Sequence, residues 1–491
     1  MKVIAKAAIV GAAMLAASAP SAGAQEATCT VDVQRGDLGK ANKALAVAQI
    51  ATKPADKKKN LSEAVRTLSR MKDKSAPEWN FLLGQALGGL ADLPETPAVA
   101  TRGSLGFTDA QDVTVDVLAA ADSAFTAFET ARPECKSEVV GYRQRPWVNL
   151  VNAAIQHVNA DQNDSAAHYA RRSLVIYRES PYAYNVLAAV AQRAGDKAQT
   201  EANLRRTIET AGEDTTFADI KKGAMLALAG LTAESASSLE GDAAKAKYTE
   251  AAGLFRQYLA MEPKDPAATA GLGEALLLAG DSAAYDAHYK GVAADAANYS
   301  DVQLFRACTE AVRAERNDVA TALCEAGVAK NPYYRDGLYV LATAYYSADA
   351  ADKMMPVAQR LVAVDPSNPD SYQLLAGAFQ LKQKVEKDAK AKRALTDSVV
   401  AYMQKAEALP GRVSFTRFAM DGAKRTLVGS VQNSGKAQKS FTVKIEFLDK
   451  AGNVVATQEA TVGPVKPQES AEFTVTAEND AIIAYRYAPL S

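Results

Sequence analysis

The stretch PYYRDGLYVLATAYYSADAADKMMPVAQRLVAVDP, residues 332–366, decides the fold of most of this chain. Its apolar residues recur at helical spacing, and Asn-Pro and Asp-Pro pairs mark loops at its two ends. Pro332 and Pro366 lie 34 residues apart, and Pro263 precedes Pro332 by two such periods plus one residue. We therefore expect helical hairpins that repeat about every 34 residues.

Other parts of the chain carry the same spacing of small and large apolar residues. The matching sets are Leu272, Gly273 and Leu276; Leu304, Ala307, Cys308 and Ala311; Leu338, Leu341, Ala342 and Tyr345; Tyr372, Leu375, Ala376 and Phe379; and Tyr184, Leu187, Ala188 and Ala191. This pattern resembles the tetratricopeptide repeat (TPR) family. The resemblance implies a mostly α protein, a superhelical α-α solenoid of about eight hairpins over residues 77–410, after a capping segment and hairpin over residues 25–76.

The composition changes after Pro410. Phe441, Val443, Ile445 and Phe447 alternate with polar residues, as in a half-buried strand, and residues 449–453 have turn chemistry. Five or six short strands predict a small antiparallel β-sandwich over residues 411–491. Residues 429–433 and 447–452 resemble bacterial immunoglobulin-like domains of the FxLYD type, which implies an accessory module without catalytic activity.

The first residues predict export. Lys2 and Lys6 precede an apolar run, residues 7–17, that is too short to span a bilayer, and Ala22-Gly23-Ala24 supplies small residues at a cleavage site. We expect a signal peptide over residues 1–24, cleaved after Ala24, and a periplasmic or otherwise exported protein. No later segment has the 18 or so uncharged apolar residues that a membrane helix needs, so no membrane insertion is expected after cleavage.

Four cysteines are an even number, which suits an oxidising compartment. Of the three possible connectivities we favour Cys29 with Cys135 and Cys308 with Cys324. Cys308 and Cys324 lie on facing helices of one predicted hairpin, and their positions along the helices are about one helical turn from direct apposition.

Charge and motifs exclude several functions. The formal net charge of −1 argues against a nucleic-acid partner. Two basic runs, Lys57-Lys58-Lys59 and residues 382–393, are interpreted as solvated faces in preference to sites for an anionic partner. Only three histidines are present, none at ligand spacing, and no nucleotide or hydrolase motif occurs. We expect no metal, no cofactor and no catalytic residue; Trp79 and Trp147 are interpreted as packing residues in preference to sugar platforms.

The TPR resemblance implies that the chain binds its partner in the concave groove lined by the first helix of each hairpin. Carried over position by position, the groove residues are Arg145, Asn152, Gln156, Tyr182, Asn185, Gln192, Arg193, Phe305, Thr309, Arg313, Asp336, Tyr339, Thr343, Tyr346, Gln373 and Gln380. We predict an exported, non-catalytic scaffold that binds a protein or peptide partner in the cell envelope. The alternatives are an envelope protein that binds cell-wall glycan and, third, an enzyme.

Overall fold

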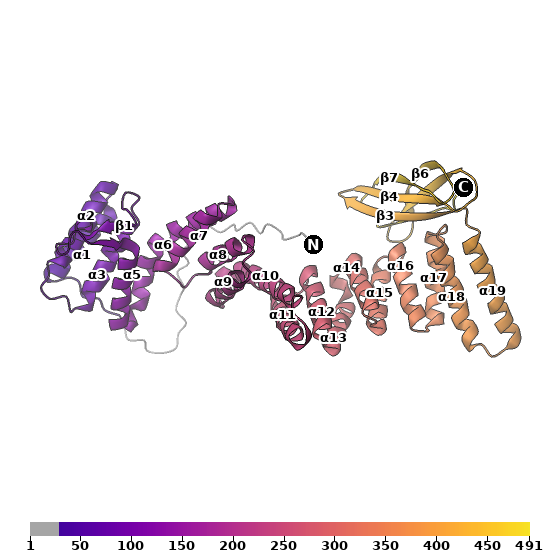
Figure 1. Ribbon diagram of the computed structural model, residues 1–491, viewed down its shortest axis with the longest axis horizontal. Coiled ribbons are helices and arrows are strands. Elements are labelled where there is room, and N and C mark those ends of the chain that lie inside the picture. Colours follow the sequence, from indigo (N-terminus) through magenta and orange to yellow (C-terminus); the bar gives the residue numbers. More distant parts are fainter. Residues whose placement is uncertain (1–28) are drawn as a thin grey trace. The chain divides into compact units, whose positions relative to one another are not determined.

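The computed structural model describes residues 29–491, so the predicted signal peptide lies outside the described residues. The chain divides into two compact units, the first ending at Ser235 and the second spanning Ala236–Ser491. Each unit is described by itself. The described residues form 19 α-helices followed by antiparallel sheets, which confirms an α solenoid with a small β domain at its C-terminal end (Figure 1).

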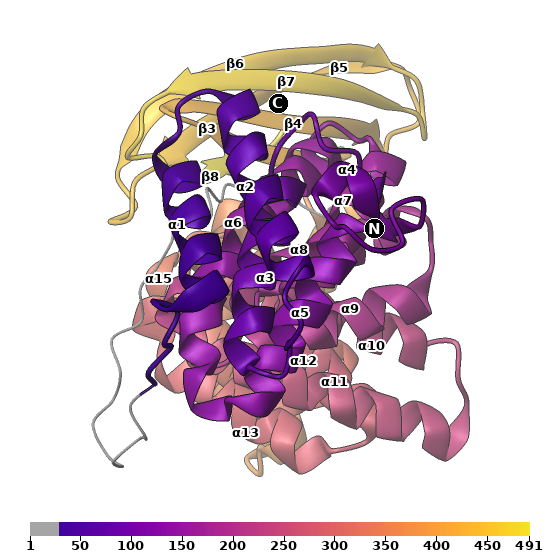
Figure 2. The ribbon, with the colours of Figure 1, turned by 90° about the vertical axis from the view of Figure 1, so that its left-hand side faces the viewer.

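Unit 1 consists of antiparallel helix pairs that pack on one another (Figure 2). The pairs are α1 (Gly36–Ile50) with α2 (Pro54–Ser69), α3 (Pro77–Ala91) with α5 (Val117–Ala131), α6 (Lys136–Asn159) with α7 (Asn163–Ile176), and α8 (Pro181–Arg193) with α9 (Lys197–Ala211). The helix α10 (Ala218–Ala236) follows them, and the 3-10 turns η1 (Pro133–Cys135) and η2 (Thr215–Phe217) precede α6 and α10.

The insertion between α3 and α5 has structure of its own. It forms a small antiparallel pair of strands, β1 (Val99–Thr101) and β2 (Thr114–Asp116), around the one-turn helix α4 (Arg102–Leu105). The Ser69 hydroxyl at the end of α2 donates to the Asp109 carboxylate over 2.8 Å and holds the insertion against the helices. No periodic pattern in the sequence predicted these elements, because each is only three or four residues long.

Helix α6 begins earlier than the sequence suggested. The pattern placed the start of this first helix near Trp147, whereas α6 begins at Lys136 and continues through Pro146. Val139 and Arg143, in its early turns, are both buried. Packing of these turns outweighs the hydrogen bond that a proline removes from a helix interior.

Unit 2 continues the helical repeat. Its helices are α11 (Gly241–Met261), α12 (Pro266–Ala279), α13 (Ser282–Ala294), α14 (Asp301–Arg313), α15 (Asn317–Lys330), α16 (Arg335–Ser347), α17 (Ala351–Val364), α18 (Pro369–Val385) and α19 (Ala389–Glu407), with the 3-10 turn η3 (Ala296–Asn298) before α14. The first residues of α14, α16 and α18 are 34 residues apart, as the sequence period requires.

Small residues allow close approach of helices both within a hairpin and between successive hairpins. A Cβ atom on Gly337 of α16 would lie 2.2 Å from the ring of Phe305 on α14, and one on Gly273 of α12 would lie 2.3 Å from the Tyr289 hydroxyl on α13. Both contacts are shorter than any real packing distance. The two positions therefore require glycine, and the large ring opposite each one fills the space.

The predicted cysteine pairing is confirmed. Cys29 is bonded to Cys135 with their Cα atoms 4.9 Å apart, and Cys308 is bonded to Cys324 with their Cα atoms 5.4 Å apart. The expected offset between Cys308 and Cys324 was wrong, because the α14–α15 turn centres near Glu315 and leaves the two cysteines at nearly the same level. All four cysteines are paired.

The C-terminal domain is a sandwich of two three-stranded antiparallel sheets. One sheet has the order β3-β4-β7 and the other β6-β5-β8, with β3 (Gly411–Asp421), β4 (Lys424–Asn433), β5 (Lys439–Leu448), β6 (Val454–Val465), β7 (Ser470–Glu478) and β8 (Ala484–Tyr487). The alternating residues of β5 all point into the core between the sheets, and Phe441, Val443, Ile445 and Phe447 are at most 1% exposed. Its assignment to the FxLYD family stays a prediction.

The sandwich docks on the solenoid of unit 2 through buried polar contacts. The Tyr487 hydroxyl donates to the Asp365 carboxylate and accepts from the Ser367 backbone amide over 3.1 Å. The Asn331 side chain donates to the Ile483 carbonyl over 3.1 Å. Burial raises the pKa of the Asp365 carboxyl, and the charge of Arg335 acts in the opposite direction. These hydrogen bonds hold the sandwich at the N-terminal ends of α16 and α18.

Candidate partner-binding groove

Three successive first helices form the best-defined candidate surface. Helix α16 contacts α14 on one side and α18 on the other. Since these helices start 34 residues apart, residues separated by 34 occupy equivalent places on them. Tyr339 of α16 is thus equivalent to Gln373 of α18, and Tyr346 is equivalent to Gln380.

Two tyrosines dominate this surface. Tyr339 is 41% exposed and Tyr346 is 43% exposed. Every other aromatic side chain in the described part of the chain, residues 29–491, is buried or half-buried. Exposed aromatic rings are costly to leave in water and are enriched at the centres of protein interfaces. Their restriction to one stripe of one helix makes α16 the candidate for a binding surface.

The opposite face of α16 explains why these rings point outward. Leu338, Leu341 and Tyr345 are buried, so helical geometry turns Tyr339 and Tyr346 away from the core. The Tyr345 hydroxyl donates to the Glu325 carboxylate over 2.6 Å, and Lys353 pairs with the same carboxylate over 2.9 Å. Burial raises the pKa of the Tyr345 hydroxyl, and Glu325 acts in the same direction. These contacts of Tyr345 therefore fix the orientation of α16 about its own axis.

The exposed rings lie on the face that α16 shares with α18, and we call this face the trough because the TPR resemblance places the concave groove there. Seven residues separate Tyr339 from Tyr346, which is about 10 Å along a helix axis. Between them Thr343 is half-buried, and its hydroxyl donates to the Tyr339 carbonyl over 2.9 Å. On α18 the equivalent residue is Gly377, and a Cβ atom there would lie 3.1 Å from the Tyr346 ring. The Tyr346 ring therefore packs beside Gly377, and Thr343 and Gly377 are the small residues between the exposed tyrosine and glutamine side chains.

The amide side chains of α18 add hydrogen-bonding groups to the trough. Gln373 and Gln380 are both exposed and also lie two helical turns apart. Each primary amide has two donor hydrogens and one acceptor oxygen. The trough can therefore bond an extended peptide backbone while the tyrosine rings contact apolar side chains.

The other predicted groove residues of unit 2 differ in their exposure to solvent. Arg313 is exposed at the end of α14 and Thr309 is half-buried. Asp336 is exposed and forms an ion pair with Arg335. Phe305 is only 6% exposed and packs against Tyr334, with ring centroids 4.9 Å apart. Phe305 therefore seals the junction between hairpins, and we leave it out of the accessible trough.

In unit 1 the predicted groove residues lie on α6 and α8, which contact each other. Four are exposed, namely Arg145, Gln156, Gln192 and Arg193, and three are half-buried, namely Asn152, Tyr182 and Asn185. Arg193 donates to the Val158 carbonyl over 2.7 Å and pairs with Asp161 over 3.2 Å, so it ties α8 to the end of α6. Tyr182 packs edge-on against Phe217. This surface is polar and has no exposed ring.

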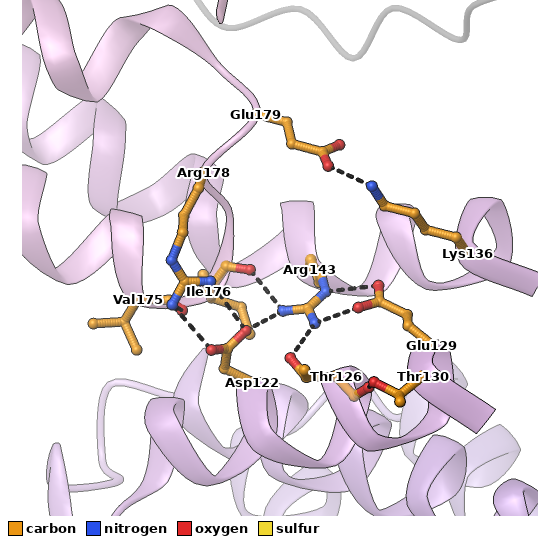
Figure 3. Close-up of polar contacts among 10 residues, drawn as sticks. All are labelled: Asp122, Thr126, Glu129, Thr130, Lys136, Arg143, Val175, Ile176, Arg178 and Glu179. Atoms are coloured by element: carbon orange, nitrogen blue, oxygen red, sulfur yellow. Dashed lines mark hydrogen bonds and ion pairs between the residues drawn. The ribbon is translucent and has the colours of Figure 1, made fainter. Parts of the chain in front are cut away.

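A buried arginine in unit 1 joins helices α5, α6 and α7 (Figure 3). Arg143 of α6 forms ion pairs with Asp122 and Glu129 of α5 and donates to the Ile176 carbonyl over 3.0 Å. Burial disfavours the charged guanidinium, but the two carboxylates outweigh it and raise the pKa of Arg143. Arg178 joins the network by pairing with Asp122 over 3.0 Å. Because every member is partnered within the protein, we regard this cluster as structural.

The two tryptophans are packing residues. Trp147 is 5% exposed and stands edge-on to Tyr177, so it offers no ring to a sugar. Trp79 is half-buried, and its indole nitrogen donates to the Leu68 carbonyl over 2.9 Å. Trp79 does line an open cavity of about 380 Å³ together with Lys74, Arg102 and Phe107. The insertion between α3 and α5 forms one wall of this cavity, which sequence reasoning did not find.

Within residues 29–491, histidine, cysteine and acidic side chains form no group of three or more that could hold a metal ion. His157 and His168 both pack against the ring of Tyr169. The same residues contain no helix that combines the length and the apolar character needed to cross a bilayer.

No protein-family model matches the chain, and neither does any curated protein. The chain is similar to solved structures of low identity. MamA is 15% identical, and the match covers 46% of this chain and 90% of MamA with a TM-score of 0.22. YrrB, described as a TPR protein with an unusual peptide-binding site, is 12% identical, and the match covers 50% of this chain and 95% of YrrB with a TM-score of 0.25. The TPR domain of P58(IPK) is 11% identical, and the match covers 75% of this chain and 99% of that domain with a TM-score of 0.22. At such scores the similarities bear on neither the partner nor the site.

Proposed function

We propose that this chain is an exported, non-catalytic scaffold that binds an extended segment of a protein partner in the trough on α14, α16 and α18. The observation that carries the proposal is the exposure of Tyr339 and Tyr346 on one stripe of α16, when every other aromatic side chain of residues 29–491 is at least half-buried. The two rings are separated by about 10 Å along the axis of α16, so side chains of one extended segment could lie against both rings.

The trough suits a peptide better than it suits a folded surface or a reacting substrate. Aromatic rings and neutral amides supply apolar contact and hydrogen bonds without a fixed charge requirement. Acid-base chemistry requires titratable groups held close to a substrate, and the trough residues Thr343, Gln373 and Gln380 are not titratable between pH 4 and 9 or so.

Crosslinking and affinity capture from intact envelopes test the proposal. The double change Tyr339→Ala with Tyr346→Ala is expected to weaken partner capture at least about tenfold, or roughly 1.4 kcal/mol. Both side chains are exposed, so helicity measured by circular dichroism should be unchanged.

A matched control is available on α19, the second helix of its hairpin. Val400 and Met403 are exposed to a similar extent, 48% and 38%, and lie outside the trough. Changing both to alanine should leave capture intact. Unchanged capture by the tyrosine variant, together with loss of capture by the α19 variant, would show that the trough is not the binding surface.

Export and the chemistry of the partner require separate measurements. N-terminal sequencing of the mature protein should begin at Gln25 or within a few residues, and intact Met1 on most molecules would exclude the cleaved signal peptide. Glycan strands in the captured fraction, in place of protein, would favour the alternative of a cell-wall binding protein.

A further inference from the structure

The last turn of the solenoid differs from the turns before it. Helices α14 and α16 each have 13 residues, whereas α18 has 17 and begins at the equivalent position. The four additional residues lengthen α18 by about 6 Å at its C-terminal end. The α18–α19 turn therefore projects beyond the neighbouring turn of unit 2, at the end of these helices that is remote from the sandwich (Figure 1).

This projecting turn is rich in cations. Residues 382–393 contain six lysine or arginine residues and only two acidic ones. Lys382 pairs with Asp352 over 2.9 Å and Lys384 with Asp349 over 3.1 Å, so these two are neutralised by the adjacent turn. The remaining four, namely Lys387, Lys390, Lys392 and Arg393, are exposed and have no ion-pair partner among residues 29–491.

The two acidic side chains of the turn have local roles. Glu386 accepts from the backbone amide of Lys387 over 2.8 Å, and Asp388 caps α19 by accepting from the Ala391 amide over 2.7 Å. In contrast, Lys390, Lys392 and Arg393 lie in the first turns of α19, where the helix dipole disfavours cations. Local stability therefore does not explain why three cations occupy these positions.

An exposed apolar residue stands among these charges. Val385, the last residue of α18, is 73% exposed. A projecting turn that carries an exposed apolar side chain within a few residues of several exposed cations matches a surface with anionic headgroups above a hydrocarbon layer. A nucleic acid or another polyanion would use the cations but would gain nothing from Val385.

We propose that the α18–α19 turn docks the protein peripherally on a membrane that carries anionic phospholipid, with Val385 entering the headgroup region. This revises the sequence-based interpretation of residues 382–393 as a purely solvated face. The proposal is independent of the peptide trough, which lies on other residues.

Flotation of the full-length mature protein with lipid vesicles tests this inference. Vesicles of phosphatidylcholine with phosphatidylglycerol should bind at least about tenfold more protein than pure phosphatidylcholine vesicles. Binding should be lost near 1 M salt, where the Debye length is about 3 Å. Changing all four unpaired cations to glutamine should reduce binding at least about tenfold, and Val385→Ser should reduce it severalfold.

The other basic run of the chain supplies a matched control. Lys57, Lys58 and Lys59 lie within α2, where Lys57 and Lys58 are half-buried, and their change to glutamine should leave binding unaltered. Equal loss from both sets of changes, or no vesicle binding by the parent protein, would overturn the inference. Retention on immobilised heparin that depends on the four cations, without vesicle binding, would assign the turn to a soluble polyanion and would also overturn it. Circular dichroism of each variant separates a loss of binding from a loss of fold.

Discussion

The two disulfides should stabilise the protein by different amounts, because they close loops of very different length. Cys29–Cys135 spans 106 residues and Cys308–Cys324 spans 16. Cross-linking removes conformational entropy from the unfolded chain, and the loss grows with the logarithm of loop length. The chain-entropy relation gives about 5 kcal/mol for the first bond and about 3 kcal/mol for the second at room temperature.

The perturbation is the paired replacement of each bond by alanines. The first variant is Cys29→Ala with Cys135→Ala, and the second is Cys308→Ala with Cys324→Ala. Alanine is preferable to serine because Cys135, Cys308 and Cys324 are fully buried, and a hydroxyl there would add an unsatisfied polar group.

The distribution of tryptophan allows each unit to be followed by its own signal. Trp79 and Trp147 are the only tryptophans in the sequence, and both belong to unit 1. Fluorescence in a urea titration therefore reports on unit 1, while far-ultraviolet circular dichroism reports on all helices. With a urea dependence of about 1–3 kcal/mol per M, the first variant should lower the fluorescence midpoint by roughly 2 M or more.

The second variant should leave the fluorescence midpoint unchanged and lower only a component of the circular dichroism transition. An equal or larger loss from the 16-residue loop would refute the loop-entropy reasoning and point to packing around the sulfur atoms. A shift of the fluorescence transition by the second variant would refute the independence of the two units that nearest-neighbour packing in a solenoid predicts.

Three further changes follow from buried groups. Arg143→Met removes the cation that pairs with Asp122 and Glu129, whose side chains are 17% and 18% exposed. The free energy of unfolding, followed by fluorescence, should fall by about 3 kcal/mol, and a decrease below about 1 kcal/mol would contradict the buried network. Gly337→Ala should destabilise unit 2 by about 1–3 kcal/mol through overlap with Phe305, whereas Gly253→Ala, with open space around it, should stabilise by about 0.5–1 kcal/mol; equal effects in circular dichroism titrations would be inconsistent with this close approach. Burial lowers the pKa of His288 below its unfolded value near 6.5, so the unfolded chain binds the proton first and stability falls as pH drops through that value; His288→Gln should remove this part of the pH dependence, and an unchanged profile would argue against it.

Periodicity alone predicted much of the solenoid. The 34-residue spacing of Pro332 and Pro366 reappears as the spacing between the starts of α16 and α18, because each hairpin must bury the same apolar stripe against its neighbour. The even number of cysteines and the facing positions of Cys308 and Cys324 led to the observed pairing. The alternation along β5 likewise predicted a strand whose inward residues form the sandwich core.

Accessibility was decided only by tertiary structure. Phe305 and Tyr339 occupy equivalent places in two consecutive repeats, yet Phe305 is buried and Tyr339 is exposed. The difference arises because Phe305 fills the space that Gly327 and Gly337 leave on neighbouring helices, while no neighbour covers Tyr339. A repeat pattern specifies where a residue lies on its own helix, but the side chains of the adjoining repeats determine whether it reaches solvent. The basic α18–α19 turn likewise projects because α18 is about one helical turn longer than its neighbour α16, and only the packing of the two helices side by side makes that difference in length a projection.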